Sequence, residues 1–213
     1  INAVATICEE VGADVNDVVL GMGYDKRIGH DFLRPGPGYG GSCFPKDTSA
    51  LVRIAEDAGY DFGLLRSAMA VNEEQFDRVA AKIADLVGGD LTGRRIALWG
   101  LTFKARTDDR RESPALHIAR RLLAAGAQLQ AHDPTVGDGP LAELPEVVVS
   151  ADPYAACEGA EALVVLTEWD EFRWLDFDKV ASVMAAARVM DTRNLLERAA
   201  LVRRGFDYVG LGR

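Results

Sequence analysis

The change in hydrophobic period near Thr92 constrains the fold most strongly. Downstream of it, short apolar segments typical of β-strands alternate with segments of helical period. Two helices are expected to begin at Ser113-Pro114 and Asp152-Pro153, because each pair is an N-cap residue followed by proline. Such alternation predicts an α/β domain with a Rossmann-like, mostly parallel sheet covered on both faces. The expected strands are residues 95–99, 128–131, 147–149, 162–166, 188–190 and 208–209.

Upstream of Thr92 the sequence is helical, with expected helices at 1–12, 15–20, 45–59 and 64–87. The last of these carries a long apolar stripe, and Asn72 and Glu73 are among the polar residues expected to lie off it. Since no segment of equal length is evident in the chain, we expect the matching helix of a second copy to cover the stripe in a homodimer. The predicted domains are a helical central, dimerisation region at 1–91 and an α/β domain at 92–213.

Composition limits the classes of partner. The formal net charge of −9 argues against nucleic acid, and no apolar run is long enough to suggest a membrane span. The three cysteines are far apart and lack metal-ligand spacing, which indicates free thiols in a reducing, cytoplasmic compartment. The first helix has no preceding cap, so we expect the chain to be part of a longer protein.

A loop rich in glycine and proline precedes one of these cysteines. Four glycines fall within the six residues from Gly36 to Gly41, a density that suits close approach to a ligand and that packing alone does not readily explain. Cys43 follows, just before the helix that Pro45 opens. A lone cysteine is usually a small buried hydrophobe, but the glycines and the helix start favour a reactive thiol here.

Charged residues flank that thiol. Lys46 and the positive end of the helix dipole favour the thiolate of Cys43, which is the reactive form. Asp47, in the first helical turn, is expected to act on the same bound group, although it could simply complement the dipole.

A second candidate site follows the first expected strand. The loop after Trp99 is basic in an acidic protein, which favours anion binding beside the helix that Ser113 caps. The residues after Gly100 do not form GxGxxG, so the loop is a poor candidate for a standard dinucleotide site. Its cations are Lys104, Arg106, Arg110 and Arg111.

Both segments resemble one enzyme family. GYGGSCFPKD at 38–47 and GLTFKARTDDRRESPA at 100–115 are similar to the catalytic loop and the UDP-binding signature of the UDP-glucose/GDP-mannose dehydrogenases. The resemblance extends from the opening residues to DTRN at 191–194. It implies oxidation of the sugar C6 alcohol to a carboxylate, with NAD as cofactor and UDP-glucose as substrate.

The resemblance also implies roles for individual residues. Cys43 is the expected catalytic nucleophile, which forms a thioester, and Asp47 assists proton movement and the hydrolytic water. Lys46 and Arg111 are expected to serve NAD. The residues expected to contact the nucleotide sugar are Arg27, donated to the neighbouring subunit, and Phe32, Leu33, Tyr39, Gly40, Phe103, Lys104 and Arg193.

Some family features have no counterpart in this sequence. The NAD-binding domain and an upstream lysine–asparagine pair are missing, so we expect these residues alone to bind nucleotide sugar weakly and not to turn over. Two other functions stay open: a GDP-mannose 6-dehydrogenase, and a non-catalytic nucleotide-binding dimerisation module in which Cys43 is vestigial.

Overall fold

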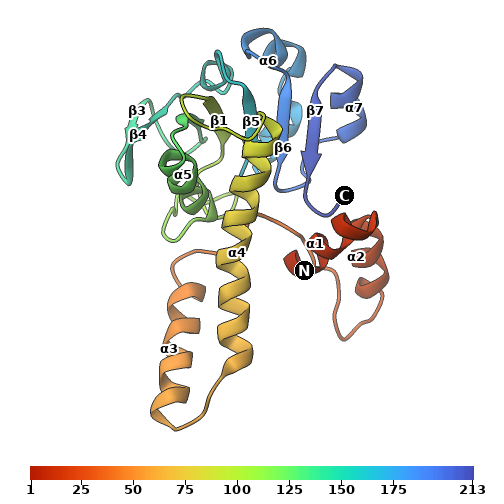
Figure 1. The fold of residues 1–213 in the computed structure, drawn as a ribbon, viewed down its shortest axis with the longest axis vertical. Helices are drawn as coiled ribbons and strands as arrows, with labels where there is room; N and C mark the ends of the chain where they lie inside the picture. The colour runs from red at the N-terminus through yellow and green to blue at the C-terminus, as the bar shows by residue number, and fades with distance from the viewer.

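The computed structural model describes residues 1–213 and has an α/β body with two helical extensions (Figure 1). One extension is formed by helices α1 and α2, and the other is an antiparallel hairpin of α3 and α4. None of the helices combines the length and the apolar content needed to cross a bilayer. The four helices are α1 (Asn2–Val11), α2 (Val15–Gly23), α3 (Phe44–Asp57) and α4 (Gly63–Leu86).

The body is built on a seven-stranded sheet in the order β3-β4-β2-β1-β5-β6-β7. Every neighbouring pair is parallel except β3 and β4, so the predicted fold class is confirmed. The order reverses at β1, which lies between β2 and β5. The strands are β1 (Arg95–Trp99), β2 (Gln128–His132), β3 (Gly139–Leu141), β4 (Leu144–Val149), β5 (Ala162–Val165), β6 (Arg188–Asp191) and β7 (Asp207–Gly210).

Alternation along the strands divides the core between the two faces of the sheet. Ile96 and Leu98 face α4 and α5 (Pro114–Ala124), while Ala97 and Trp99 face the opposite side. Helix α5 begins as predicted, because the Ser113 side chain accepts a hydrogen bond from the backbone N–H of Ala115. The opposite face is covered by η1 (Ala155–Cys157), η2 (Asp170–Trp174), α6 (Phe177–Val183) and α7 (Arg198–Arg203).

Two element predictions were wrong. The helix expected at Asp152-Pro153 is only the short 3₁₀ turn η1, which begins at Ala155. The antiparallel edge strand β3 was missed because Gly139 and Pro140 do not read as a strand. Proline is tolerated there because an edge strand has one side without ladder hydrogen bonds.

The apolar stripe of α4 is divided between two environments. Phe76, Val79 and Ile83 are buried in the core with α5 and the sheet, so the expectation that a second copy covers the whole stripe was wrong. Farther from the sheet, the hairpin projects from the body (Figure 1), and Leu64 of α4 and Ile54 of α3 are 79% and 63% exposed. The intrachain core therefore accounts for only one half of the helix.

The α1–α2 extension is tied to the far end of the sequence. The Glu9 carboxylate of α1 accepts a hydrogen bond from the backbone N–H of Gly212 at 2.7 Å and pairs with Lys82 of α4 at 3.0 Å. The backbone N–H of Val15 donates to the carbonyl of Gly212 at 2.8 Å. Residues that follow the last strand thus hold the first two helices in place.

Candidate functional site

Cys43 lies where the sequence predicted it. It is the N-cap residue of α3, with Phe44 and Pro45 in the first turn, and its thiol is exposed. The Sγ atom is 3.7 Å from the Ser42 hydroxyl. The other cysteines, Cys8 and Cys157, are buried, and burial raises the pKa of the Cys157 thiol to about 12. Cys43 is therefore the one cysteine that an external reactant can reach.

The charges beside Cys43 are paired with each other. Lys46 Nζ contacts Asp47 Oδ1 at 2.5 Å, and both side chains are exposed. This hydrogen bond is the main cause of a raised Lys46 pKa, to which the charges of Asp47 and, more weakly, Cys43 contribute. Both residues thus lie near the thiol, but in this arrangement they neutralise one another.

A second cation interacts electrostatically with the thiol from the α/β body. Arg111 donates two side-chain hydrogen bonds to Asp109, at 2.8 and 2.9 Å. These bonds raise the Arg111 pKa, and its Coulombic interaction with Cys43 raises it further. Arg111 also holds the pKa of Asp109 at about 2, and a hydrogen bond from Ser42 contributes. The residue assigned to NAD from the sequence therefore lies close enough to the thiol for their charges to interact.

The glycines before Cys43 have a packing explanation that the sequence analysis did not foresee. A Cβ on Gly40 would lie 1.9 Å from the carbonyl oxygen of Glu112, and one on Gly41 would lie 2.9 Å from the ring of Phe103. Gly38 has φ of 133°, and a Cβ there would lie 2.5 Å from Phe76. The expectation that packing could not account for these glycines was wrong, because the loop lies directly against α4 and the α/β body.

The largest pocket, of about 570 Å³, lies between α1, the glycine loop and α4. We call it the main pocket. Phe32, Tyr39 and Arg193 border it, as does Phe44 beside the thiol. The Tyr39 and Phe44 rings meet edge to face at 4.8 Å. Three residues assigned to the nucleotide sugar from the sequence thus line one pocket. Phe44, which directly follows Cys43, lines it too.

Arg193 separates the main pocket from a second one of about 430 Å³, which Leu33 and Arg34 also line. Its Nε donates to the carbonyl of Leu166 at 2.8 Å and pairs with Glu168 at 3.1 Å. Burial lowers the Arg193 pKa, an effect that the charges of Glu168 and Asp191 oppose. The guanidinium is therefore a fixed wall of both pockets, with Nη1 towards Gly36.

The basic loop after β1 is less basic than its sequence suggests. Arg106 pairs with Asp170 at 2.9 Å and Arg110 with Glu143 at 2.9 Å. Lys104 is exposed, has no carboxylate partner, and lies 5.3 Å from the centre of the neighbouring Phe103 ring. Lys104 thus remains the cation of this loop available to an external anion.

The turn after β1 gives a physical reason why it is not a standard dinucleotide site. The Asp133 carboxylate accepts hydrogen bonds from the backbone N–H groups of Leu101, at 2.7 Å, and Thr102, at 3.3 Å. In dinucleotide-binding folds such N–H groups face a pyrophosphate. Here an internal anion uses them.

Arg27 is not brought to either pocket. Its side chain is 89% exposed after α2 and pairs with Asp25 at 2.6 Å. Within one copy of the chain it lies apart from the other candidate residues, since it lines neither pocket.

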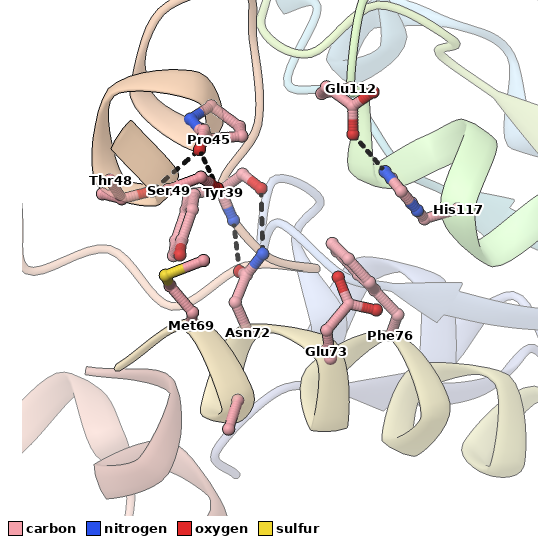
Figure 2. A pocket seen from close by; sticks show the side chains of 11 residues that line it. Tyr39, Pro45, Thr48, Ser49, Met69, Asn72, Glu73, Phe76, Glu112 and His117 are labelled. Carbon is pink, nitrogen blue, oxygen red and sulfur yellow. Dashed lines mark hydrogen bonds and ion pairs between the residues drawn. The ribbon is translucent and has the colours of Figure 1, made fainter. Parts of the chain in front are cut away.

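The polar residues that hold the loop were not predicted from the sequence. Asn72, placed off the apolar stripe, is buried and bonds both backbone groups of Tyr39 (Figure 2). Gln75 and Asn2 bond Gly36. The spacing of Asn72 and Gln75 from Phe76 and Val79 could have signalled this, because it places amides beside the buried face. The side chains drawn in Figure 2 line a smaller pocket that reaches Pro45 and Thr48 of α3. Its volume is about 310 Å³.

Models of a single enzyme family match most of the chain. Residues 1–74 match the central domain of the UDP-glucose/GDP-mannose dehydrogenase family, and residues 97–198 match its UDP binding domain. The chain belongs to this family. Both matches agree with the motifs around Cys43 and Lys104.

Relatives and solved structures agree with the family match. The chain is 46% identical to a UDP-glucose 6-dehydrogenase of Pseudomonas aeruginosa and 44% identical to one of Rhizobium meliloti, matching 100% of this chain and 48% and 49% of theirs. A UDP-glucose dehydrogenase structure from Pyrobaculum islandicum is 33% identical with a TM-score of 0.80, covering 98% of this chain and 46% of that one. The chain thus spans about half the length of the curated relatives it matches.

Proposed function

We propose that this chain forms the thiol and nucleotide-sugar half of an NAD-dependent UDP-glucose 6-dehydrogenase. The observation that carries the proposal is the exposed Cys43 at the start of α3, next to Phe44 of the main pocket. The names of the relatives supply the substrate, since those at 44–46% identity are UDP-glucose 6-dehydrogenases.

Cys43 explains how an alcohol can be oxidised by four electrons at one site. Loss of a hydride and a proton from the C6 alcohol gives an aldehyde, whose remaining carbonyl hydrogen cannot leave as hydride until a nucleophile adds to the carbon. Addition of the Cys43 thiolate gives a thiohemiacetal, and loss of a further hydride and proton gives a thioester. Water then cleaves the thioester to the carboxylate and restores the thiol. Each hydride would be accepted by a separate molecule of NAD, two for each sugar oxidised.

The neighbours of Cys43 have separate tasks in this proposal. Asp47, on the first turn of α3, takes up protons and orients the hydrolytic water once its pairing with Lys46 loosens. Arg111 provides positive charge beside the sulfur. These groups can assist only if the sugar C6 lies against Cys43.

The pocket residues favour a nucleotide sugar. Phe32, 94% exposed, and Tyr39 offer aromatic surface, while Gly40 keeps the loop against the body. Leu33 lines the second pocket. The fixed Arg193 and Lys104, which lines neither pocket, are the cations suited to the diphosphate, and Phe103 connects them, since its carbonyl accepts from Arg193 at 3.4 Å. A pocket with aromatic and cationic walls suits a base, a diphosphate and a sugar together.

Only two residues of this chain, Arg111 and Lys46, suit a contact with NAD, and that contact would be with its pyrophosphate. Arg111 has a side chain that is 72% exposed, and Lys46 one that is also 72% exposed, so both can turn to the pyrophosphate of NAD, which would accept the hydrides. The turn after β1 does not fit, because Asp133 takes its N–H groups. We propose that NAD is held mainly by the part of the relatives that this chain does not match.

Two alternative functions can be distinguished from the proposed one by experiment. A GDP-mannose 6-dehydrogenase would share the thiol and differ in the base it accepts. A non-catalytic module would bind nucleotide sugar with no use of the thiol. The exposure of Cys43 beside two paired carboxylate–cation couples favours a catalytic thiol over a vestigial one.

Replacement of Cys43 tests the proposal. In the intact enzyme, Cys43→Ser should abolish formation of UDP-glucuronate, because an oxygen ester is far harder to cleave than a thioester. Cys8→Ser, at a buried cysteine away from the site, is the matched control and should retain turnover per folded enzyme. Rates of acid formation are measured with UDP-glucose and with GDP-mannose. Wild-type rates in Cys43→Ser would exclude the covalent mechanism, and a preference for GDP-mannose would transfer the proposal to the alternative substrate.

A further inference from the structure

Three side-chain amides hold the glycine loop at its backbone. The Asn2 Oδ1 atom accepts from the N–H of Gly36 at 2.9 Å, and Gln75 Nε2 donates to the carbonyl of Gly36 at 2.8 Å. Asn72 Oδ1 accepts from the N–H of Tyr39 at 2.8 Å, and Asn72 Nδ2 donates to its carbonyl at 3.2 Å. Four backbone groups of a four-residue segment are thus satisfied by side chains of α1 and α4.

Asn72 is the centre of this arrangement. It is buried and makes both bonds to one residue, as Figure 2 shows. Gln75 is three residues farther along α4 and therefore on the same side of the helix. A Cβ on Gly38 would lie 3.0 Å from Asn72 Oδ1. A side chain at position 38 would therefore push the loop away from the amide.

The other end of α4 makes the anchor rigid. Phe76, directly after Gln75, begins the half of α4 that is buried in the core of the α/β body. A loop bonded to Asn72 is therefore fixed relative to the sheet. Tyr39 and Asn72 also form a wall shared by the main pocket and the smaller pocket.

Only three residues separate Tyr39 from Cys43. Gly40 and Gly41 of this link lie against Glu112 and Phe103 of the α/β body, so the link has little room to move independently. The point at which Asn72 holds Tyr39 therefore sets both the pocket wall and the position of the thiol.

We propose that Asn72 is a positioning residue, whose amide holds Tyr39 so that the main pocket and the Cys43 thiol keep the distance needed for reaction. The inference rests on the proposed function for its chemistry, and it assigns to Asn72 no contact with substrate. Gln75 and Asn2 support it at Gly36.

Hydrogen exchange tests the contact itself. Asn72→Ala should speed exchange of the Tyr39 amide about tenfold, the effect of losing one side-chain acceptor, and leave the Gly36 amide protected by Asn2. Asn72→Asp keeps an acceptor for the Tyr39 N–H but loses the donor to its carbonyl, so the Tyr39 amide should stay protected. Glu74→Ala, an exposed change on the same helix, is the matched control. Unchanged exchange in Asn72→Ala would overturn the proposal.

Kinetics of the intact enzyme test the consequence. Asn72→Ala should lower kcat about tenfold and raise KM for UDP-glucose, with rates expressed per folded enzyme, because misplacement of reacting groups costs rate steeply. Asn72→Asp should fall between Asn72→Ala and Glu74→Ala. Faster exchange with kcat and KM within about twofold of Glu74→Ala would mean that the amide serves the fold alone, and would overturn the proposal.

Thiol reactivity separates this inference from the proposed function. In the intact enzyme, Asn72→Ala should slow alkylation of Cys43 by iodoacetamide about fivefold relative to Glu74→Ala, because a shifted loop weakens the charge interaction between the thiol and Arg111. If the intact wild type fails to oxidise UDP-glucose, the proposed function fails, and the alkylation rates alone decide the inference. Equal rates in Asn72→Ala and Glu74→Ala would then overturn it.

Discussion

Each glycine of the loop before Cys43 faces a different part of the molecule. Gly36 lies against Arg193, Gly38 against Phe76, Gly40 against the backbone of Glu112 and Gly41 against Phe103. The loop thereby joins α4 to the α/β body across a gap too narrow for side chains. The contact is possible because glycine has no Cβ.

Gly40 provides the sharpest test at the residue scale. Its neighbour is a backbone carbonyl, 1.9 Å from an added Cβ, so relief requires the loop to shift. We expect Gly40→Ala to lower the free energy of unfolding by about 1–3 kcal/mol, the usual cost of overpacking, and to slow turnover. Denaturant unfolding monitored by fluorescence provides the measurement.

Gly21→Ala is the control for Gly40→Ala. Gly21 lies in α2 with open space around it, and alanine favours a helix by up to about 1 kcal/mol over glycine. Its unfolding free energy should rise or stay level. An equal loss in both variants would show that the close approach at Gly40 is not the cause.

The thiol was predictable from the sequence, but its surroundings were not. Cys43, Pro45 and Lys46 lie within four residues of each other, so local rules on helix starts are enough to predict their positions at the beginning of a helix. Arg111 comes from a loop nearly seventy residues later, and the packing of Gly40 on Glu112 and of Gly41 on Phe103 brings that loop towards the thiol. The roles of the site residues stay predictions.

At the scale of elements, α4 has two different halves. The half near the sheet is core, whereas the projecting half carries exposed apolar side chains. A period of 3.6 residues identifies the stripe along the whole helix, but it does not identify what covers each turn. For this reason the sequence predicted the helix correctly, but it did not predict which half of the helix is buried within the chain.

Substitutions in the two halves should have unlike effects. Phe76→Ala removes a ring that is 1% exposed and packs against His117, so we expect a loss of about 3–5 kcal/mol in unfolding free energy. Leu64→Ala, at a side chain that is 79% exposed, should change the unfolding of an isolated copy by less than about 0.5 kcal/mol. Thermal and denaturant unfolding at low protein concentration measure both. A large loss for Leu64→Ala there would indicate burial within one copy.

The parallel sheet was the most predictable part of the fold. Strands β1, β5 and β6 are nearly continuous buried runs, and β2 and β4 mix buried with exposed residues; both patterns are typical of strands. Strand β3 and the turn η1 depend instead on tertiary pairing, so their local sequences were not informative.

At the scale of the whole molecule, the isolated position of Arg27 fits the proposed homodimer. In an isologous pair each copy can lend Arg27 to its neighbour. We expect Arg27→Ala and Cys43→Ser each to inactivate the intact enzyme. Random mixing of the two should make about half of the dimers mixed and restore about a quarter of wild-type activity, because one of the two sites in each mixed dimer is complete.

Recovered activity and dimer composition are measured together. Mass spectrometry under native conditions counts the mixed dimers, and the assay follows formation of UDP-glucuronate. No recovery despite mixed dimers would contradict a donated Arg27 and would assign the residue to its own copy or to the surface.

The tie between Glu9 and Gly212 bears on how the protein matures during synthesis. Helices α1 and α2 are synthesised before the sheet, yet two of the contacts that hold them, from Glu9 and Val15, end on Gly212. A growing chain folds while its later residues are still in the ribosome. These two helices therefore lack both contacts until Gly212 has emerged, and we expect the pocket that Asn2 borders to form later than the sheet.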